Sequence, residues 1–442
     1  MASNLRRPVK DISRGRVLEG LRPSRVLFVA TCSALLSTPQ VLNYFKILPV
    51  LLPLLLAALL LLASHRQRLA EIRVPAVLLA LCFWVFTSAL WSDSLAITIV
   101  QSIATAVVFL IAAIVGTHCS LREVLAGLII GGLTVAALSL AVAIVSPSYG
   151  LMPAGYQGGS LRGLYIHRNL LAEVLAPAAV ATLAFRFGGR WGFFVKATCL
   201  ATLLGTIFAT RSSTAIGVVA AVTGLAIVLD AIRRVDRRWR AVAVLTAIAT
   251  GVAAVAGVVS NLRIVFALLQ RDDTLTGRTL IWNAVFQLIE DRPFEGYGWG
   301  AVWGDGAAAR TFVTRSVLFE VDSAHNGYLE ILLQIGLVGL VLFVLTLALV
   351  LVRGMRQFVL SGSVESTFGP LLVASLVAYN LAEASMVSTL SLFTLGVIAS
   401  NVRPTRVQPT STTGGAGSAR NRLRRPPVRA NAASGFYTRM PS

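Results

Sequence analysis

The chain has 442 residues, of which 56% are hydrophobic and 13% are charged, and its formal net charge is +20. This much apolar surface exceeds what a water-soluble core can bury, so the composition excludes an ordinary soluble enzyme. The basic residues fall mostly between apolar runs and at the two chain ends. They therefore indicate membrane orientation and contact with anionic membrane lipid, and we expect no nucleic-acid partner.

Apolar runs long enough to cross a bilayer as helices, about 17 to 25 residues each, recur along the chain. A helix satisfies its own backbone hydrogen bonds inside the hydrocarbon layer, and barrel strands would be about half as long. The sequence therefore predicts an all-α polytopic membrane protein with about 12 transmembrane helices. The predicted spans are 26–42, 46–63, 74–91, 95–117, 124–145, 170–185, 192–210, 213–231, 241–260, 327–352, 367–384 and 386–402.

The first two spans are interrupted by Pro39 and Lys46, and they could instead form one re-entrant unit. The first 25 residues are rich in arginine and lead into an apolar stretch without a clear small-residue cleavage site. That pattern favours an uncleaved first span over a signal peptide.

The distribution of lysine and arginine predicts the orientation. With a cytoplasmic N-terminus, 29 of the 39 Lys and Arg residues lie on the inner side, as the positive-inside rule requires. We therefore expect a multi-pass protein of the cytoplasmic (inner) membrane with both termini in the cytoplasm. Residues 1–25 form its basic N-terminus, and residues 403–442 form a basic tail whose composition predicts disorder.

The spans divide the chain into helices 1–9 over residues 26–260 and helices 10–12 over residues 327–402. Two predicted outer segments are longer than simple turns. One is an outer loop at 146–169, and the other is a large extracytoplasmic loop at 261–326 between helices 9 and 10. Loops of this length are uncommon unless they carry function. We expect the chemistry to lie there.

The large loop contains an amphipathic helix that is predicted to start at Thr276 and to stop at Pro293. Its apolar residues are Ile281, Trp282, Val285, Leu288 and Ile289. It would lie on the outer membrane surface, where Arg278 offers a guanidinium to a lipid-linked phosphate. The alternative is a lid or packing element without a role in binding.

The end of the large loop carries the leading catalytic candidate. His325 and Asn326 lie where the chain re-enters the membrane, and a histidine exchanges protons near neutral pH, so His325 is predicted as a general base. The alternative is a structural histidine that caps the next helix.

Further polar residues lie at the predicted outer face. Arg211 is an isolated charge at the end of a helix pair, where it either binds a ligand or simply extends to the interface. The outer loop adds Arg162 and Asn169, which flank His167 and Arg168 in SLRGLYIHRN.

Two carboxylates are placed within spans by this reading. Glu173 lies just inside the sixth span, and Glu383 lies in the eleventh with Asn380. Charged groups at such depth are functional candidates, although either could pair with an arginine as a packing contact.

The four cysteines occur singly, at Cys32, Cys82, Cys119 and Cys199, without the spacing of a metal site, so we expect neither disulfides nor a metal. A Gly-rich, lysine-containing phosphate loop is also missing from the sequence. The outer arginines, histidine and acids suit the handling of an anionic lipid carrier without cofactors.

At these residues the chain resembles the O-antigen ligase and O-antigen polymerase superfamily of bacterial membrane glycosyltransferases. The similar stretches span roughly residues 160–345 and are LRGLYIHRNLLAEVLAP, the T-R-S-S run at 210–213, GRTLIWNAVFQLIEDRPFEGYGWG and SAHNGYLEILLQIGLVGL. The order R-x-x-x-W, R-P-x-x-G-x-G and H-N-x-x-L-E is the specific part of the likeness. The predicted topology extends it to the whole chain.

The resemblance implies transfer of a glycan from an undecaprenyl-diphosphate carrier to a polysaccharide or glycolipid acceptor at the outer face of the membrane, without metal or nucleotide. Arg211 and Arg278 would bind the diphosphate, and His325 would deprotonate or orient the acceptor hydroxyl. Arg162, Asn169 and Asn326 are candidate contacts of glycan or phosphate. The loop lacks the conspicuous extra helices of some members, and the basic tail is unusual.

The sequence leaves ligase and polymerase activity equally open and identifies neither sugar nor acceptor. It also leaves two other classes open. One is a secondary transporter for a small anion or sugar, since twelve spans also suit carriers. The other is a flippase or scaffold of a polysaccharide assembly complex.

Overall fold

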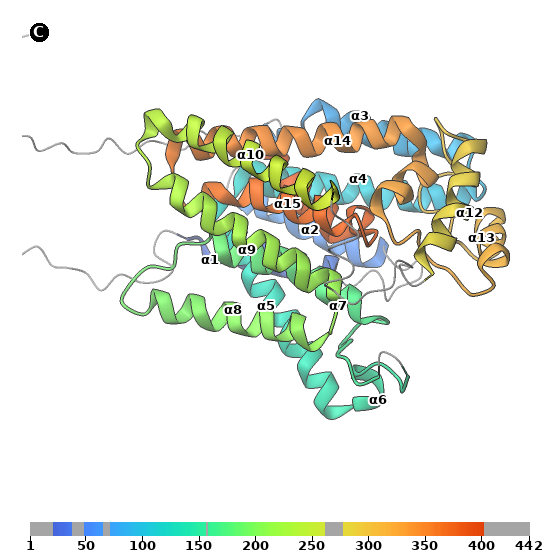
Figure 1. Ribbon diagram of the computed structural model, residues 1–442, viewed down its shortest axis with the longest axis horizontal. Coiled ribbons are helices and arrows are strands. Elements are labelled where there is room, and N and C mark those ends of the chain that lie inside the picture. Colours follow the sequence, from blue (N-terminus) through green and yellow to red (C-terminus); the bar gives the residue numbers. More distant parts are fainter. Residues whose placement is uncertain (1–20, 38–47, 65–70, 156–157, 261–276, 402–442) are drawn as a thin grey trace, which may run out of the picture. The chain divides into compact units, whose positions relative to one another are not determined.

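The computed structural model describes residues 21–37, 48–64, 71–155, 158–260 and 277–401. Apart from one β-bridge between Leu151 and Leu161, the described residues form helices and their connections. The helices are α1 (Pro23–Leu36), α2 (Leu48–Ser64), α3 (Ala76–Thr87), α4 (Leu95–His118), α5 (Leu121–Val145), α6 (Pro147–Gly150), α7 (Arg168–Ala184), α8 (Gly192–Ala209), α9 (Ser213–Arg233), α10 (Arg237–Ser260), α12 (Arg278–Asp291), α13 (Ala308–Val317), α14 (Gly327–Ser361), α15 (Phe368–Tyr379) and α16 (Thr389–Ser400) (Figure 1). This confirms the predicted all-α membrane class.

Every predicted span overlaps one of these helices. Five of the described helices, α4, α5, α8, α9 and α14, are long and apolar enough to cross a membrane by length and composition. The full count of spans stays a prediction. The predictions for the extreme N-terminus, for Pro39 and Lys46, for Thr276 and for the tail 403–442 concern positions outside the described residues.

Small residues let neighbouring helices approach closely. Gly127 and Gly131, one turn apart on α5, face Val29 and Ser33 of α1, and a Cβ at either glycine would overlap those side chains. This small-xxx-small pattern packs membrane helices through van der Waals contact, because lipid offers no hydrophobic drive between them. The contact between α1 and α5 depends on it.

Helix α14 is broken near its N-terminal end. Ile335 and Gly336 leave the helical conformation, and Gly336 has a φ of +64°. The loop that follows α12 fills the break, because the backbone amides of Tyr297 and Gly298 donate to the carbonyls of Leu333 and Gln334 at 2.9 Å. The R-P-x-x-G-x-G motif thus anchors the large loop onto the bundle.

A second break separates α15 from α16. Glu383, which was predicted within the eleventh span, is not helical: α15 ends at Tyr379, and Glu383 lies in the connection that follows. The buried Asn380 holds this connection open: its Nδ2 donates to the carbonyl of Leu376 and its Oδ1 accepts from the amide of Met386. A side chain thereby replaces the lost helical hydrogen bonds.

The large loop has its own small core at one end of the bundle (Figure 1). The predicted helix is confirmed as α12, but its apolar residues Ile281, Val285 and Leu288 are buried against α13 and the start of α14. The face that was expected to meet the membrane therefore packs inside the protein. Helix α13 was not predicted, since its four-residue repeat of apolar positions is short and interrupted by arginines.

Candidate functional site

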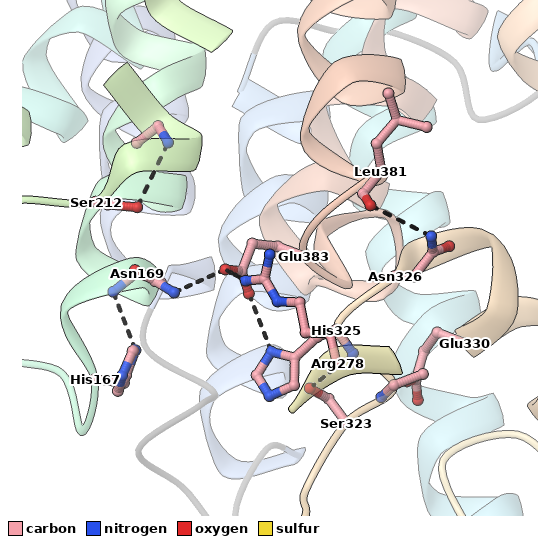
Figure 2. Close-up of polar contacts among 12 residues, drawn as sticks. His167, Asn169, Ser212, Arg278, Ser323, His325, Asn326, Glu330, Leu381 and Glu383 are labelled. Atoms are coloured by element: carbon pink, nitrogen blue, oxygen red, sulfur yellow. Dashed lines mark hydrogen bonds and ion pairs between the residues drawn. The ribbon is translucent and has the colours of Figure 1, made fainter. Parts of the chain in front are cut away.

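A nearly buried carboxylate gathers residues from four segments of the chain. Arg278 Nη2 donates to Glu383 Oε1 at 2.8 Å, and Asn169 Nδ2 donates to the same oxygen at 2.7 Å. His325 Nδ1 lies 3.4 Å from Glu383 Oε2 (Figure 2). We call these four residues the Glu383 cluster. They come from the start of α7, the start of α12, the turn before α14 and the break between α15 and α16.

The acid of the cluster is nearly buried, whereas the arginine and the histidine are partly exposed. The side chain of Glu383 is 10% exposed, whereas the side chains of Arg278 and His325 are 21% and 32% exposed. A carboxylate at such depth needs charged and polar donors to offset its desolvation, and the arginine and the asparagine provide them. The arginine and the histidine still reach solvent, so both can also contact a ligand.

The turn before α14 presents the histidine. Asn326 is the N-cap of α14, since its Oδ1 accepts from the amides of Tyr328 and Leu329, at 3.0 and 3.2 Å. Asn326, and not His325, therefore caps this helix. The side-chain oxygen of Asn326 is already used by these two backbone amides. His325 has a φ of +48°, a left-handed conformation that is costly for a residue with a Cβ. This strain is concentrated at the candidate base.

Ala324, which precedes the histidine, is fixed from both sides. Its amide donates to Glu330 Oε2 at 2.8 Å, and its carbonyl accepts from Trp282 Nε1 at 3.0 Å. The buried Glu330 also accepts from Trp303 Nε1 at 2.5 Å. Trp282 lies one helical turn after Arg278, so one face of α12 supplies both the ligand of Glu383 and the support of the histidine turn.

The start of α7 is held by a second histidine. His167 is its N-cap, and His167 Nδ1 accepts from the amide of Asn169 at 3.2 Å. An accepting ring nitrogen must be unprotonated. Burial lowers the pKa of His167 below its ordinary value, a shift that the neighbouring Arg168 and His325 reinforce and the carboxylates of Glu383 and Asp322 oppose. The neutral cap orients Asn169 toward Glu383.

Arg211 lies in the turn between α8 and α9. It is exposed, its φ is +53°, and its side chain has no hydrogen-bond or ion-pair partner among the described residues. Its backbone carbonyl accepts from Arg168 Nη1 at 2.9 Å, which ties the turn to the start of α7 beside Asn169. The turn thus presents a free guanidinium at the same end of the bundle as the Glu383 cluster.

Arg162 is placed differently. Its guanidinium donates to the carbonyls of Tyr149, Ser148 and Ile166, all within the outer loop, and lies over the Tyr149 ring. These contacts give Arg162 a role in shaping the loop. Its candidate contact with glycan or phosphate stays a prediction without support from this geometry.

The structure brings the predicted candidates Arg278, His325 and Asn169 together, with Asn326 and Arg211 beside them. Sequence reasoning named Glu383 as a functional candidate but did not connect it with these residues. Glu383 carried a signal, as a lone carboxylate in an apolar stretch, yet its distance along the chain from the loop motifs concealed the contact. Glu330 was visible only as a letter of the H-N-x-x-L-E motif. Among the described residues, no group of three or more His, Cys, Asp or Glu side chains could hold a metal ion.

Comparison with known proteins gives two matches. Residues 198–344 match the family model described as O-antigen ligase. The exopolysaccharide production protein ExoQ of Rhizobium meliloti (strain 1021) is 27% identical over 217 residues, which are 45% of this chain and 49% of that protein. The chain is thus aligned with about half of this curated relative.

The matched family segment contains Arg211, Arg278 and His325, whereas Asn169 and Glu383 lie outside it. The structure therefore adds two residues to a site that the family match covers only in part. Over residues 198–344, which bear these three residues, the chain is similar to the O-antigen ligase family.

Proposed function

We propose that the protein transfers or polymerises a glycan from an undecaprenyl-diphosphate carrier onto a sugar hydroxyl at the outer face of the cytoplasmic membrane. The acceptor is a polysaccharide or a glycolipid. The observation that carries the proposal is the Glu383 cluster, in which an accessible histidine and an accessible arginine share one buried carboxylate beside a second, free arginine.

His325 acts as the general base in this mechanism. Its Nδ1 faces Glu383, so the ring keeps that nitrogen protonated and offers Nε2 to the acceptor hydroxyl. The hydroxyl proton passes to Nε2, the acceptor oxygen bonds to the anomeric carbon, and the bond from that carbon to the diphosphate breaks. Glu383 then stabilises the imidazolium, as the acid of a catalytic triad does.

The electron pair of the broken bond stays with the diphosphate, whose negative charge grows as the carrier leaves. Arg278 uses one nitrogen for Glu383, which fixes its orientation and leaves its other donors for a phosphate oxygen. Arg211 supplies a second guanidinium without any competing partner among the described residues. Preorganised charge of this kind stabilises a transition state without reorganisation.

The alternative function, a secondary transporter, would need broken helices, and the structure has two such breaks: one within α14 and one between α15 and α16. In a secondary transporter, backbone groups freed at such breaks bind the substrate or the coupling ion. Here the carbonyls freed in α14 are already occupied, since Leu333 and Gln334 accept from the large loop and Ile335 accepts from Trp84 Nε1 at 2.8 Å. This favours the transferase.

Transfer by the purified protein in liposomes, from an undecaprenyl-diphosphate oligosaccharide, tests the proposal. His325→Asn keeps a residue that tolerates a positive φ but removes the base, and we expect a loss of about 100-fold or more in kcat. Arg211→Asn and Arg278→Gln should each reduce kcat/KM by about 100-fold.

The matched control is Arg315→Gln, which removes an exposed arginine of α13 that has no ion-pair partner among the described residues. It should retain full activity, and unchanged thermal unfolding should accompany the losses in the other variants. Full activity of His325→Asn would remove the general base from the mechanism. Substrate-driven flux into liposomes without any transfer would replace the transferase with a carrier.

A further inference from the structure

Helix α7 carries a buried acid that the proposed mechanism does not use. Glu173 lies about one helical turn after Asn169, so the two side chains share a face of the helix. Asn169 donates to Glu383 Oε1 from that face. Glu173 is 8% exposed, and its Oε1 has no hydrogen-bond partner among the described residues. The same face of α7 therefore holds both a member of the Glu383 cluster and a second carboxyl group.

The surroundings of Glu173 provide no compensating positive charge within the described part of the chain. The groups that act on its carboxyl are the carboxylate of Glu383 and the hydroxyl of Ser388, which is within hydrogen-bonding reach. Tyr379 is also buried and interacts electrostatically with both glutamates. An ionised Glu173 would therefore be a buried charge without a cation, beside a second negative charge.

Two neighbouring carboxyl groups in a site with little water do not both ionise. The repulsion between them adds to the cost of desolvating each charge, so one of the pair keeps its proton. Glu383 accepts from Arg278 and from Asn169, and both donors stabilise a charged carboxylate. Glu173 has neither a guanidinium nor an amide donor among the described residues. The proton of the pair therefore belongs to Glu173.

The hydroxyl partner of Glu173 gives the acid a structural position. Ser388 ends the connection that contains Glu383 and is the N-cap of α16, where its Oγ accepts from the amide of Ser391 at 3.4 Å. Helix α7 thus engages both the middle and the end of this connection, through Asn169 and Glu173. We propose that Glu173 is a proton-bearing positioning residue, which fixes the connection and leaves the negative charge of the pair on Glu383.

The effect of Glu173 on transfer rests on the proposed function. A second negative charge beside Glu383 would favour the imidazolium of His325 before the acceptor arrives, and an imidazolium accepts no proton. A neutral Glu173 avoids this, while its contact with Ser388 keeps Glu383 in place. Glu173 therefore acts through Glu383 and does not need to touch the substrate.

Infrared spectroscopy of the purified protein in nanodiscs at neutral pH tests the protonation directly. A protonated carboxyl group has a C=O stretching band that is well separated from the bands of a carboxylate. We expect the difference spectrum between wild type and Glu173→Gln to show the loss of one such band. The matched control is Glu290→Gln, at an exposed acid of α12, which should remove carboxylate bands alone. Loss of carboxylate bands in Glu173→Gln would overturn the inference.

Transfer by two variants tests the positioning role. Glutamine keeps the size and the hydrogen-bonding capacity of a protonated glutamate, so Glu173→Gln should keep kcat within about twofold of wild type. Leucine fills the space but cannot bond to Ser388, so Glu173→Leu should lower kcat by about tenfold. KM and thermal unfolding should stay unchanged, because the leucine leaves donor binding and packing intact. Glu173→Met replaces Glu173→Leu where the leucine variant does not fold.

Two results would contradict the positioning role. Wild-type kcat in the apolar variant would show that Glu173 acts only in packing. An equal loss of kcat in Glu173→Gln and Glu173→Leu would show that the residue acts as a charged carboxylate.

The infrared and transfer measurements also separate Glu173 from the proposed function. A protonated band assigned to Glu173, in a protein that transfers no glycan, would support the proton-bearing acid and reject the transferase. Transfer by a wild-type protein that lacks this band would keep the transferase and overturn the assignment of Glu173.

Discussion

Glu383 is the residue on which the geometry of the site depends. It holds Arg278, Asn169 and His325 at distances of 2.7 to 3.4 Å, although these residues lie far apart in the sequence. A buried carboxylate without its donors would be costly, and donors without the carboxylate would lose their common anchor. The acid therefore fixes the arginine and engages Nδ1 of the histidine, which leaves Nε2 as the other ring nitrogen.

Replacing Glu383 by Gln tests this central role. The amide keeps the shape and one acceptor oxygen but loses the charge. We therefore expect the free energy of unfolding to fall by about 1–3 kcal/mol. The transfer rate should fall by more than any loss of folded protein explains, because the His325 imidazolium loses its counterion. Thermal unfolding of the detergent-solubilised protein and the transfer rate are measured together. A Gln variant with wild-type kcat would show that Glu383 acts only in packing.

The His167 cap predicts a pH dependence. The pKa of His167 is lowered from 6.5 in the native protein, so the unfolded chain binds the proton first as the pH falls. The stability from this group is fully present above pH 6.5 and is lost as the pH falls toward the lowered native pKa.

A non-titrating cap isolates this effect. His167→Asn retains a side chain that caps helices well, and it should flatten the loss of thermal stability below pH 6.5 relative to wild type. Both proteins are compared in a His325→Asn background, which removes the other histidine of the site. Parallel pH profiles of the two proteins would exclude His167 as the source.

At the scale of elements, the site is assembled by breaks in helices. Gly327, the first residue of α14, donates from its amide to the carbonyl of Asn380 at 2.9 Å, and this contact brings the His325 turn against the Glu383 connection. A Cβ on Gly327 would overlap the Asn380 side chain. The Asn380 side chain cannot move aside without losing hydrogen bonds, because its Nδ2 donates to the carbonyl of Leu376 and to the hydroxyl of Ser385.

Gly327→Ala should therefore separate the two segments. We expect a loss of about 1–3 kcal/mol in unfolding free energy, as for other overpacked positions, together with a large loss of activity. Gly205→Ala on α8 is the control, since its Cβ would meet open space and alanine favours a helix, so it should be neutral or stabilising. Thermal unfolding of both variants gives the comparison, and an unaffected Gly327→Ala would contradict the assigned contact.

Apolar runs and charge were sufficient to predict the helices of the bundle, though not α13, because each apolar run is a local property of the chain. The start of α12 and the importance of Arg278, Arg211 and His325 could also be inferred from local motifs. The break at Gly336 could not, because it depends on the loop amides of Tyr297 and Gly298 that fill it. Glu383 was named as a candidate, but its contact with Arg278, Asn169 and His325 was not predicted for the same reason, since these residues meet only through tertiary contacts.

At the scale of the whole molecule, helix length alone undercounts the predicted spans. Helices α15 and α16 have 12 residues each, about 18 Å, against roughly 30 Å of hydrocarbon. Most of their residues are buried among other helices, so their ends need not reach the bilayer surface. Polar connections such as 380–388 are tolerated at depth when protein groups satisfy their backbone. We therefore retain twelve spans as the prediction.

Cysteine accessibility tests this topology in intact cells. With the four native cysteines replaced, Ser316→Cys on α13 should react with a membrane-impermeant maleimide from outside. Asp236→Cys, in the exposed turn between α9 and α10, should react only after permeabilisation, because the neighbouring arginines keep that turn in the cytoplasm. Labelling of both from outside would require an additional or missing span between them. Reversed labelling would place Arg211 and the Glu383 cluster on the cytoplasmic side, where a lipid-linked donor would have to be used before it is translocated.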